Sequence, residues 1–128
     1  QQNFFICASS FAQEGGIAAL RECRREVETM RRIYNERRQY LLKRLKQMGI
    51  ATRHDPCGAF YALGNVKAYS YNSYQLTLDI LNKAKVAVTP GIDFGTNCEG
   101  YIRFSYATSL DNIKEGLNRL EEYLKSIK

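Results

Sequence analysis

Several features that would assign a protein to a class at once are missing from this sequence. It has only two prolines among 128 residues, so a collagen-like or generally disordered chain is excluded. Its longest uncharged stretch runs from Gln1 to Gln13, which is too short and too polar to span a bilayer. The first residues show no signal-peptide pattern. There is no initiator methionine either, so we expect a piece of a longer protein.

The motifs of several common site chemistries are also absent. The four cysteines are scattered without a C-x-x-C pair, and the single histidine, His54, has no ligand-spaced partner, so we expect no zinc site. We expect free, mostly buried thiols in a reducing, cytoplasmic compartment. G-x-S-x-G, P-loop and G-x-G-x-x-G motifs are missing. His54 lies in a triplet typical of a surface turn, and every lysine falls on a predicted helix or polar loop.

The formal net charge of +6 is concentrated in the first part of the chain. Residues 1–48 hold ten lysines and arginines against five acids, whereas residues 49–128 hold nine against eight. A solvated basic helix face accounts for this surplus, and we prefer that interpretation. Binding of nucleic acid is kept as an alternative. It would use the arginines of the first helix: Arg21, Arg24, Arg25, Arg31, Arg32, Arg37 and Arg38.

Hydrophobic periodicity predicts three helices in a chain whose length suits one domain. The first runs from Ser10 to Met48 and is ended by Gly49. The second runs from an N-cap at Ser73 to Lys85. The third runs from Ser109, as N-cap, to Ile127.

The remaining segments predict short strands. Residues 50–63 form two runs around a turn at Pro56–Gly58, and residues 86–89 and 101–106 are rich in β-branched and aromatic residues. The order is therefore helix, strand, strand, helix, strand, strand, helix. It favours an α+β fold, with a small mixed or antiparallel sheet covered by helices on one face.

Arg103 is the residue that most needs an explanation. Strand alternation turns it away from the face that holds Ile102 and Phe104. A guanidinium in a partly dry place requires an anion, and its planar fork suits a carboxylate or a phosphate. An exposed edge position, or an internal pair with Glu99 or Asp93, is the alternative that spacing alone favours.

Three motifs occur in order along the chain: Pro56-x-Gly58-Ala59-Phe60-Tyr61, Val86-x-Val88-x-Pro90-Gly91-x-x-Phe94-Gly95 and Gly100-Tyr101-Ile102-Arg103-Phe104-Ser105-Tyr106-Ala107. Together they resemble the C-terminal part of class I/II aminotransferases, the aspartate aminotransferase superfamily of fold-type I pyridoxal-phosphate enzymes. Tyr34 with Arg37-Arg38 is similar to a helix of this family, and residues 9–20 resemble the stretch after its cofactor lysine. The resemblance covers essentially the whole chain.

The resemblance implies an excised small domain, residues 49–128, preceded by an interdomain helix segment, residues 1–48. It implies that Arg103 binds the α-carboxylate of the substrate and overturns the preference for an internal pair. It also implies that Phe60 helps to line the substrate entrance, whereas Phe94 is expected to pack in the core.

The implied parent transfers an amino group between an amino acid and a 2-oxo acid with pyridoxal phosphate. The family's cofactor residues precede this segment, so we predict no catalytic, cofactor-binding or metal-binding residue here and an inactive fragment. The parent is expected to be a homodimer that carries the missing large domain, with no nucleic-acid or membrane partner. Lyases and decarboxylases share this architecture and remain an alternative.

Overall fold

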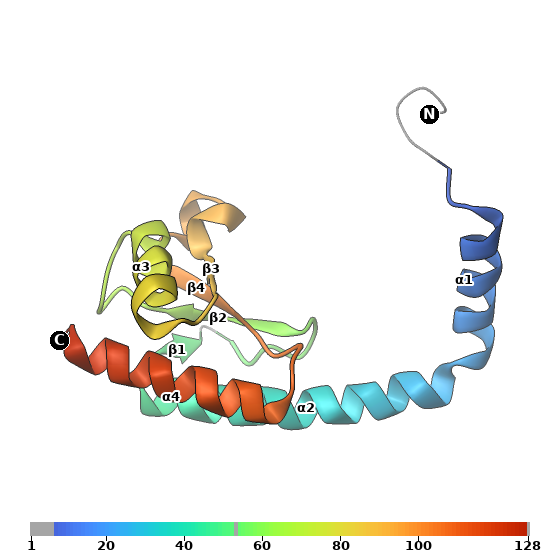
Figure 1. The fold of residues 1–128 in the computed structure, drawn as a ribbon, viewed down its shortest axis with the longest axis horizontal. Coiled ribbons are helices and arrows are strands. Elements are labelled where there is room, and N and C mark those ends of the chain that lie inside the picture. The colour runs from blue at the N-terminus through green and yellow to red at the C-terminus, as the bar shows by residue number, and fades with distance from the viewer. Residues whose placement is uncertain (1–6, 53, 128) are drawn as a thin grey trace. The chain divides into compact units, whose positions relative to one another are not determined.

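The protein was analysed as a computed structural model that describes residues 7–52 and 54–127 (Figure 1). The chain divides into two compact units, one up to Ile33 and the other from Tyr34 onwards. The first unit holds helix α1 (Ser10–Glu22) and the start of helix α2 (Arg24–Gln47). The second unit holds the rest of α2 and the remaining elements. No helix in the described ranges has the length and apolar character needed to cross a membrane.

The long helix predicted from Ser10 to Met48 is interrupted once. Cys23 ends α1 with φ −91° and ψ 24°, and α2 begins at the next residue. Ser9 caps α1, because its hydroxyl accepts from the backbone N–H of Ala12 at 3.3 Å. Gly49 follows the end of α2 with φ +77°, a left-handed conformation that favours glycine. The helical stripe of apolar residues continues through Cys23, which is why the interruption was not predicted.

A four-stranded antiparallel sheet forms the centre of the second unit. Its strands lie in the order β1 (Ala51–Thr52), β2 (Tyr61–Asn65), β4 (Tyr101–Ser105) and β3 (Thr89–Pro90). The two 3₁₀ turns η2 (Gly91–Phe94) and η3 (Thr96–Cys98) connect β3 to β4. The central pair β2–β4 therefore places Tyr61 of the first sequence motif opposite Ser105 of the third.

Helices cover one face of this sheet, as predicted. On that face Ala62, Ile102 and Phe104 are only 1%, 0% and 4% exposed. The covering elements are α2, α3 (Ser73–Asp79), the π-helical turn η1 (Ile80–Ala84) and α4 (Leu110–Ser126). Their buried side chains include Leu41, Leu45, Leu76, Ile80, Ile113, Leu117 and Leu120. The α+β prediction is confirmed.

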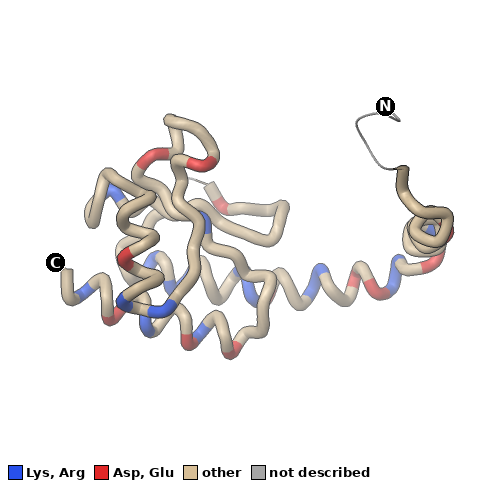
Figure 2. Tube along the Cα trace, turned by 45° about the horizontal axis from the view of Figure 1, so that its top comes forward, with Lys and Arg blue, Asp and Glu red and all other residues tan. Residues whose placement is uncertain are grey.

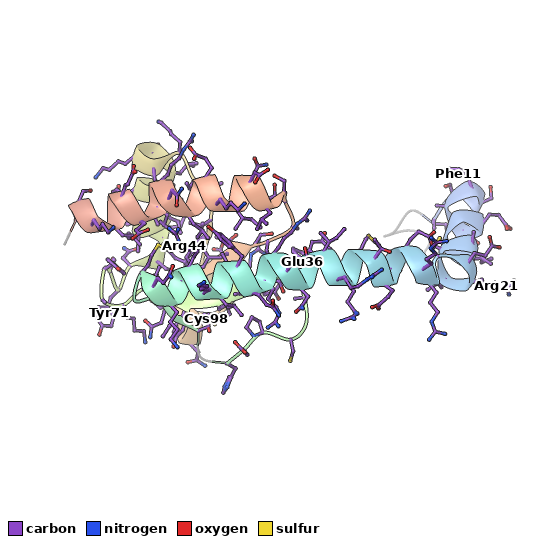
Figure 3. All side chains as sticks on the ribbon, turned by 90° about the horizontal axis from the view of Figure 1, so that it is seen from below. Phe11, Arg21, Glu36, Arg44, Tyr71 and Cys98 are labelled. Carbon is purple, nitrogen blue, oxygen red and sulfur yellow. The ribbon has the colours of Figure 1, made fainter. Side chains whose placement is uncertain are left out.

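The C-terminal half of α2 and helix α4 lie side by side under the sheet (Figures 1 and 3). Figure 3 shows Arg44 between the two helices. Its guanidinium donates to the Glu121 carboxylate at 2.7 Å across them. The hydrogen bonds and ion pairs from Lys125 and Arg44 lower the pKa of the Glu121 carboxyl, so the pair is charged at neutral pH.

Two strands differ from the prediction. Strand β2 begins at Tyr61, because Ala59 has φ +58° and cannot continue an extended chain. Of the run predicted at residues 86–89 only Thr89 pairs with the sheet, and the pairing continues to Pro90, which was predicted as part of a turn. Val86 instead packs against the helical core, so its apolar character reflects helix contacts rather than strand pairing.

Two side-chain predictions also need correction. The N-cap of α3 is Asn72, whose side chain accepts from the Gln75 N–H at 2.9 Å, and Ser73 is the first helical residue with no exposed surface. The four cysteines are free, as expected, but none is buried. Cys7 and Cys57 are exposed, and Cys23 and Cys98 are partly exposed.

Replacing Ser109 with alanine is expected to destabilise the second unit by about 1 kcal/mol. The Ser109 hydroxyl caps α4 by accepting from the backbone N–H of Asn112 at 3.2 Å, and alanine leaves that N–H without this partner. Urea unfolding followed by circular dichroism measures the loss. Ser109→Asp, which keeps a capping oxygen, should retain most of the stability. Equal losses in both variants would show that the cap is not the cause.

Candidate carboxylate-binding site

Arg103 lies in the middle of β4, and β4 pairs with another strand on each side. It stands opposite Leu63 of β2 and Thr89 of β3. Its side chain lies on the sheet face away from Ile102 and Phe104, as alternation predicted, and is partly buried. The backbone of Arg103 is held by strands on both sides, so the base of its side chain has little freedom to move.

Two aromatic rings flank the Arg103 guanidinium. Its Cζ lies 5.3 Å from the ring centroid of Tyr61 and 5.5 Å from that of Phe94. The two rings are themselves 6.5 Å apart. Cation–π contacts of this kind help to hold the guanidinium in place.

The charge of Arg103 has no acidic partner within the described chain. None of the ion pairs found among residues 7–52 and 54–127 involves it, so neither Glu99 nor Asp93 neutralises it. Its Nε atom is buried and donates no hydrogen bond. A buried donor on a charged group is costly to leave unpaired, so this position suits an anion from outside the segment.

Phe94 and Tyr61 have roles that the sequence did not predict. Phe94 was expected in the core, but it is 43% exposed, because its ring lies against Arg103 on the open sheet face. Tyr61 was not singled out. The pairing of Leu63 with Arg103 places Tyr61 two residues away on the same face, and such diagonal neighbours are within reach of an aromatic ring. Correct strand register would have identified it.

Phe60 stands next to the same aromatic group. It is 46% exposed, and its ring meets Tyr61 edge to face at 5.5 Å. Arg103 and Phe60 are the two predicted substrate-binding residues, and both contact the ring of Tyr61. The structure brings them together in space.

The loop that carries Phe60 accepts hydrogen bonds from Arg38 and Tyr106, two residues of the aminotransferase-like sequence patterns. The Arg38 guanidinium donates to the Pro56 carbonyl at 3.1 Å. The Tyr106 hydroxyl donates to the Ala59 carbonyl at 3.3 Å, and its backbone N–H donates to Phe60 at 2.9 Å. Burial raises the pKa of the Tyr106 hydroxyl, so it stays protonated and able to donate at neutral pH.

A pocket of about 370 Å³ opens beside Tyr61. Ala62, Leu63 and Tyr101 contribute to its wall, together with Asn97 and Cys98 of the η3 turn. His54 lies at this pocket but is exposed, in keeping with the predicted surface turn. The pocket shares Tyr61 with the aromatic contacts of Arg103, whereas Arg103 itself does not line it.

The described residues do not fit the binding of pyridoxal phosphate. Every lysine in the described ranges is exposed, whereas a lysine that forms a Schiff base is activated by a desolvated or cationic setting. The same ranges hold no group of three or more metal-ligating side chains. The arrangement around Arg103 can bind and orient an anion, and no step of cofactor chemistry is derived from it.

The arginines of the first helical segment are interleaved with acids. Figure 2 shows red positions among the blue ones in the first half of α2. Arg31 pairs with Glu28 at 2.7 Å, and the Arg37 guanidinium lies 5.5 Å from the Tyr34 ring. Figure 3 shows Arg21 and Phe11 on α1. Binding of nucleic acid through these arginines stays an untested alternative, and we continue to prefer a solvated helix face.

Comparison with known proteins agrees with the motifs around Arg103. The family model for aminotransferase class I and II matches residues 1–120. This chain belongs to the class I and II aminotransferase family. An aspartate aminotransferase from Pyrococcus horikoshii is 43% identical over 122 residues, which are 94% of this chain and 31% of that protein. An aromatic-amino-acid aminotransferase from Thermococcus litoralis is 40% identical over 95% of this chain and 32% of its own length.

Solved structures place the same segment within the family. An aromatic aminotransferase from Pyrococcus horikoshii superimposes with a TM-score of 0.76 at 40% identity, covering 80% of this chain and 27% of that one. The chain thus spans about a third of the length of the curated relatives it matches. The recognition of a C-terminal aminotransferase segment and of its fold is confirmed.

Proposed function

We propose that this chain is the carboxylate-binding small domain of an aminotransferase that exchanges an amino group between an amino acid and a 2-oxo acid. In this proposal residues 49–128 form the small domain, and residues 1–48 form the segment that links it to a large domain. Membership of the class I and II aminotransferase family supports the reaction class. Pyridoxal phosphate, the cofactor of this family in general, would be held by the rest of the parent.

The observation that carries the proposal is the uncompensated guanidinium of Arg103. Its buried Nε lacks a hydrogen-bond acceptor, and two aromatic rings restrict it to one position. A carboxylate is common to amino acids and 2-oxo acids, and it can accept two parallel hydrogen bonds from a guanidinium. Arg103 would bind every substrate of the reaction in the same orientation.

Phe60 and Tyr61 would act beside Arg103. Phe60 is exposed at the rim of the aromatic group, where it would line the substrate entrance and exclude water from the carboxylate pair. Exclusion of water strengthens that charged interaction. Holding the substrate in one orientation is a part of catalysis that a binding domain can supply without reacting itself.

The parent is proposed to be a cytoplasmic homodimer without nucleic-acid or membrane partners. Four free cysteines are in keeping with a reducing compartment. The names of the two relatives above differ in substrate, aspartate in one and aromatic amino acids in the other. Aspartate and aromatic amino acids share the α-carboxylate, and that group is the one assigned to Arg103.

The parent protein is expected to transfer amino groups from an amino acid to 2-oxoglutarate when supplied with pyridoxal phosphate, whereas residues 1–128 alone are expected to be inactive. The described lysines of this chain are exposed, so the chain alone should change the absorbance spectrum of added pyridoxal phosphate no more than free lysine does at the same amine concentration. Release of carbon dioxide or an elimination product by the parent, with no amino-group transfer, would instead identify a decarboxylase or lyase.

A further inference from the structure

Glu99 lies at the start of β4 and joins three separate segments. Its carboxylate Oε1 accepts from the backbone N–H of Ser73 at 2.6 Å and from that of Gly100 at 3.0 Å. The Ser73 hydroxyl accepts from the Ile92 N–H at 3.2 Å. The beginnings of α3, η2 and β4 are therefore linked through one carboxylate and one hydroxyl.

The Ser73 hydroxyl can accept from Ile92 because it does not cap α3. Asn72 takes the capping position, and Ser73 is completely buried behind it. A buried hydroxyl must find hydrogen-bond partners. Here it accepts from the Ile92 N–H, while the backbone N–H of the same serine donates to the Glu99 carboxylate.

The turn that contains Ile92 has two short hydrogen bonds of its own and packs closely at Gly91. The Gly95 N–H donates to the Ile92 carbonyl at 3.0 Å, and the Cys98 N–H donates to the Gly95 carbonyl at 2.9 Å. A methyl group on Gly91 would approach the Cys98 carbonyl oxygen to 2.1 Å. The turn also contacts α3 and β4, and the hydrogen bond at Ile92 is the one that ties it to Ser73.

Phe94 lies two residues after Ile92 in the same 3₁₀ turn. Its ring is one of the two that flank the guanidinium of Arg103, yet it is 43% exposed and has little packing of its own. Whatever fixes the turn therefore fixes the ring. The hydrogen bonds also keep the Glu99 carboxylate occupied, and they lower the pKa of that carboxyl, so it stays ionised without pairing with Arg103.

We propose that Glu99 is a positioning residue that fixes Ser73 through its backbone N–H, so that the Ser73 hydroxyl holds the Phe94 turn against Arg103, and that it leaves Arg103 available to the substrate. The inference rests on the proposed role of Arg103 as the carboxylate-binding group. Glu99 itself does not touch the substrate. Its contribution should therefore be seen in substrate binding rather than in the chemical step.

A double-mutant cycle between Glu99 and Phe94 in the full-length parent enzyme tests this role. Glu99→Ala should raise the KM for the amino acid about tenfold, as expected for lost hydrogen bonds to a charged group, with kcat within about threefold of the native value. In a Phe94→Ala background the same change should raise KM less than about twofold, because the ring that Glu99 positions is already gone.

Two further variants complete the test. Ser73→Ala removes the hydrogen bond to Ile92 and should raise KM less than Glu99→Ala does. This rise should again be smaller in the Phe94→Ala background than in the native one. Ser73→Ala therefore replaces Glu99→Ala in the test if the latter variant does not fold. Glu115→Ala on α4 removes an exposed pair with Arg119 and should leave KM unchanged. Equal KM effects of the Glu99 change in both backgrounds, or a fall in kcat with KM unchanged, would overturn the proposal.

The outcome also separates this inference from the proposed function. If Arg103→Ala impairs the enzyme but the Glu99 effect is the same with and without Phe94, only the positioning role fails. If Arg103→Ala leaves kcat/KM unchanged, the carboxylate-binding role fails first, whatever the Glu99 variants show.

Discussion

Arg103→Ala in the full-length parent enzyme is expected to lower kcat/KM by about thirty- to four-thousand-fold. This range corresponds to about 2–5 kcal/mol, the usual cost of removing one partner of a buried charged pair. The expected effect is large because, among residues 7–52 and 54–127, Arg103 is the cation that contacts the rings of Tyr61 and Phe94. Steady-state kinetics with several amino acids measure the loss.

The same loss should be found for every amino-acid substrate, since the carboxylate is their common group. Arg103→Lys should remain impaired, because an ammonium lacks the planar fork that binds a carboxylate with two hydrogen bonds. Arg119→Ala, which removes an exposed arginine of α4, is the matched control and should behave like the native enzyme. A loss confined to one substrate would point to side-chain recognition instead.

Leu45→Ala is expected to destabilise the 128-residue chain by about 2–5 kcal/mol, the range found for leucine truncation in a packed core. Leu45 has no exposed surface and belongs to the core cluster between α2, α4 and the sheet. Truncation leaves a cavity there and loses the contacts of the removed atoms. Urea unfolding, followed by the far-ultraviolet circular dichroism signal, gives the change in the free energy of unfolding.

Leu20→Ala is the control for this experiment. It makes the same chemical change on a helix, but Leu20 is 91% exposed, so its free energy of unfolding should change by less than about 0.5 kcal/mol. If Leu45→Ala lost as little stability as Leu20→Ala, the last turns of α2 would not belong to the core of the second unit. That result would contradict the described packing.

The local features of the fold could be predicted from the sequence where a short pattern determines them. Ser109 and Gly49 mark the ends of helices through their own hydrogen-bonding and backbone preferences. The alternation around Arg103 identifies which side chains of β4 are buried. Such features depend on neighbouring residues, and the structure confirms them.

The features that were not predicted depend on residues far apart in the chain. The aromatic contacts of Arg103 require the register of β2 against β4 and the path of η2. Ser73 was taken for a cap because a serine before a helix favours that position, whereas its partners Ile92 and Glu99 lie 19 and 26 residues away. Hydrophobic periodicity contains no information about such contacts.

The most direct test of the carboxylate-binding role compares two inhibitors of the parent enzyme that differ only in that group. One is a 2-oxo acid or an analogue with a free carboxylate, and the other is its primary amide. The native enzyme should bind the carboxylate at least about tenfold more tightly, and Arg103→Ala should reduce that preference to within about twofold. An undiminished preference for the carboxylate in the variant would contradict the account, because some other group would then bind it.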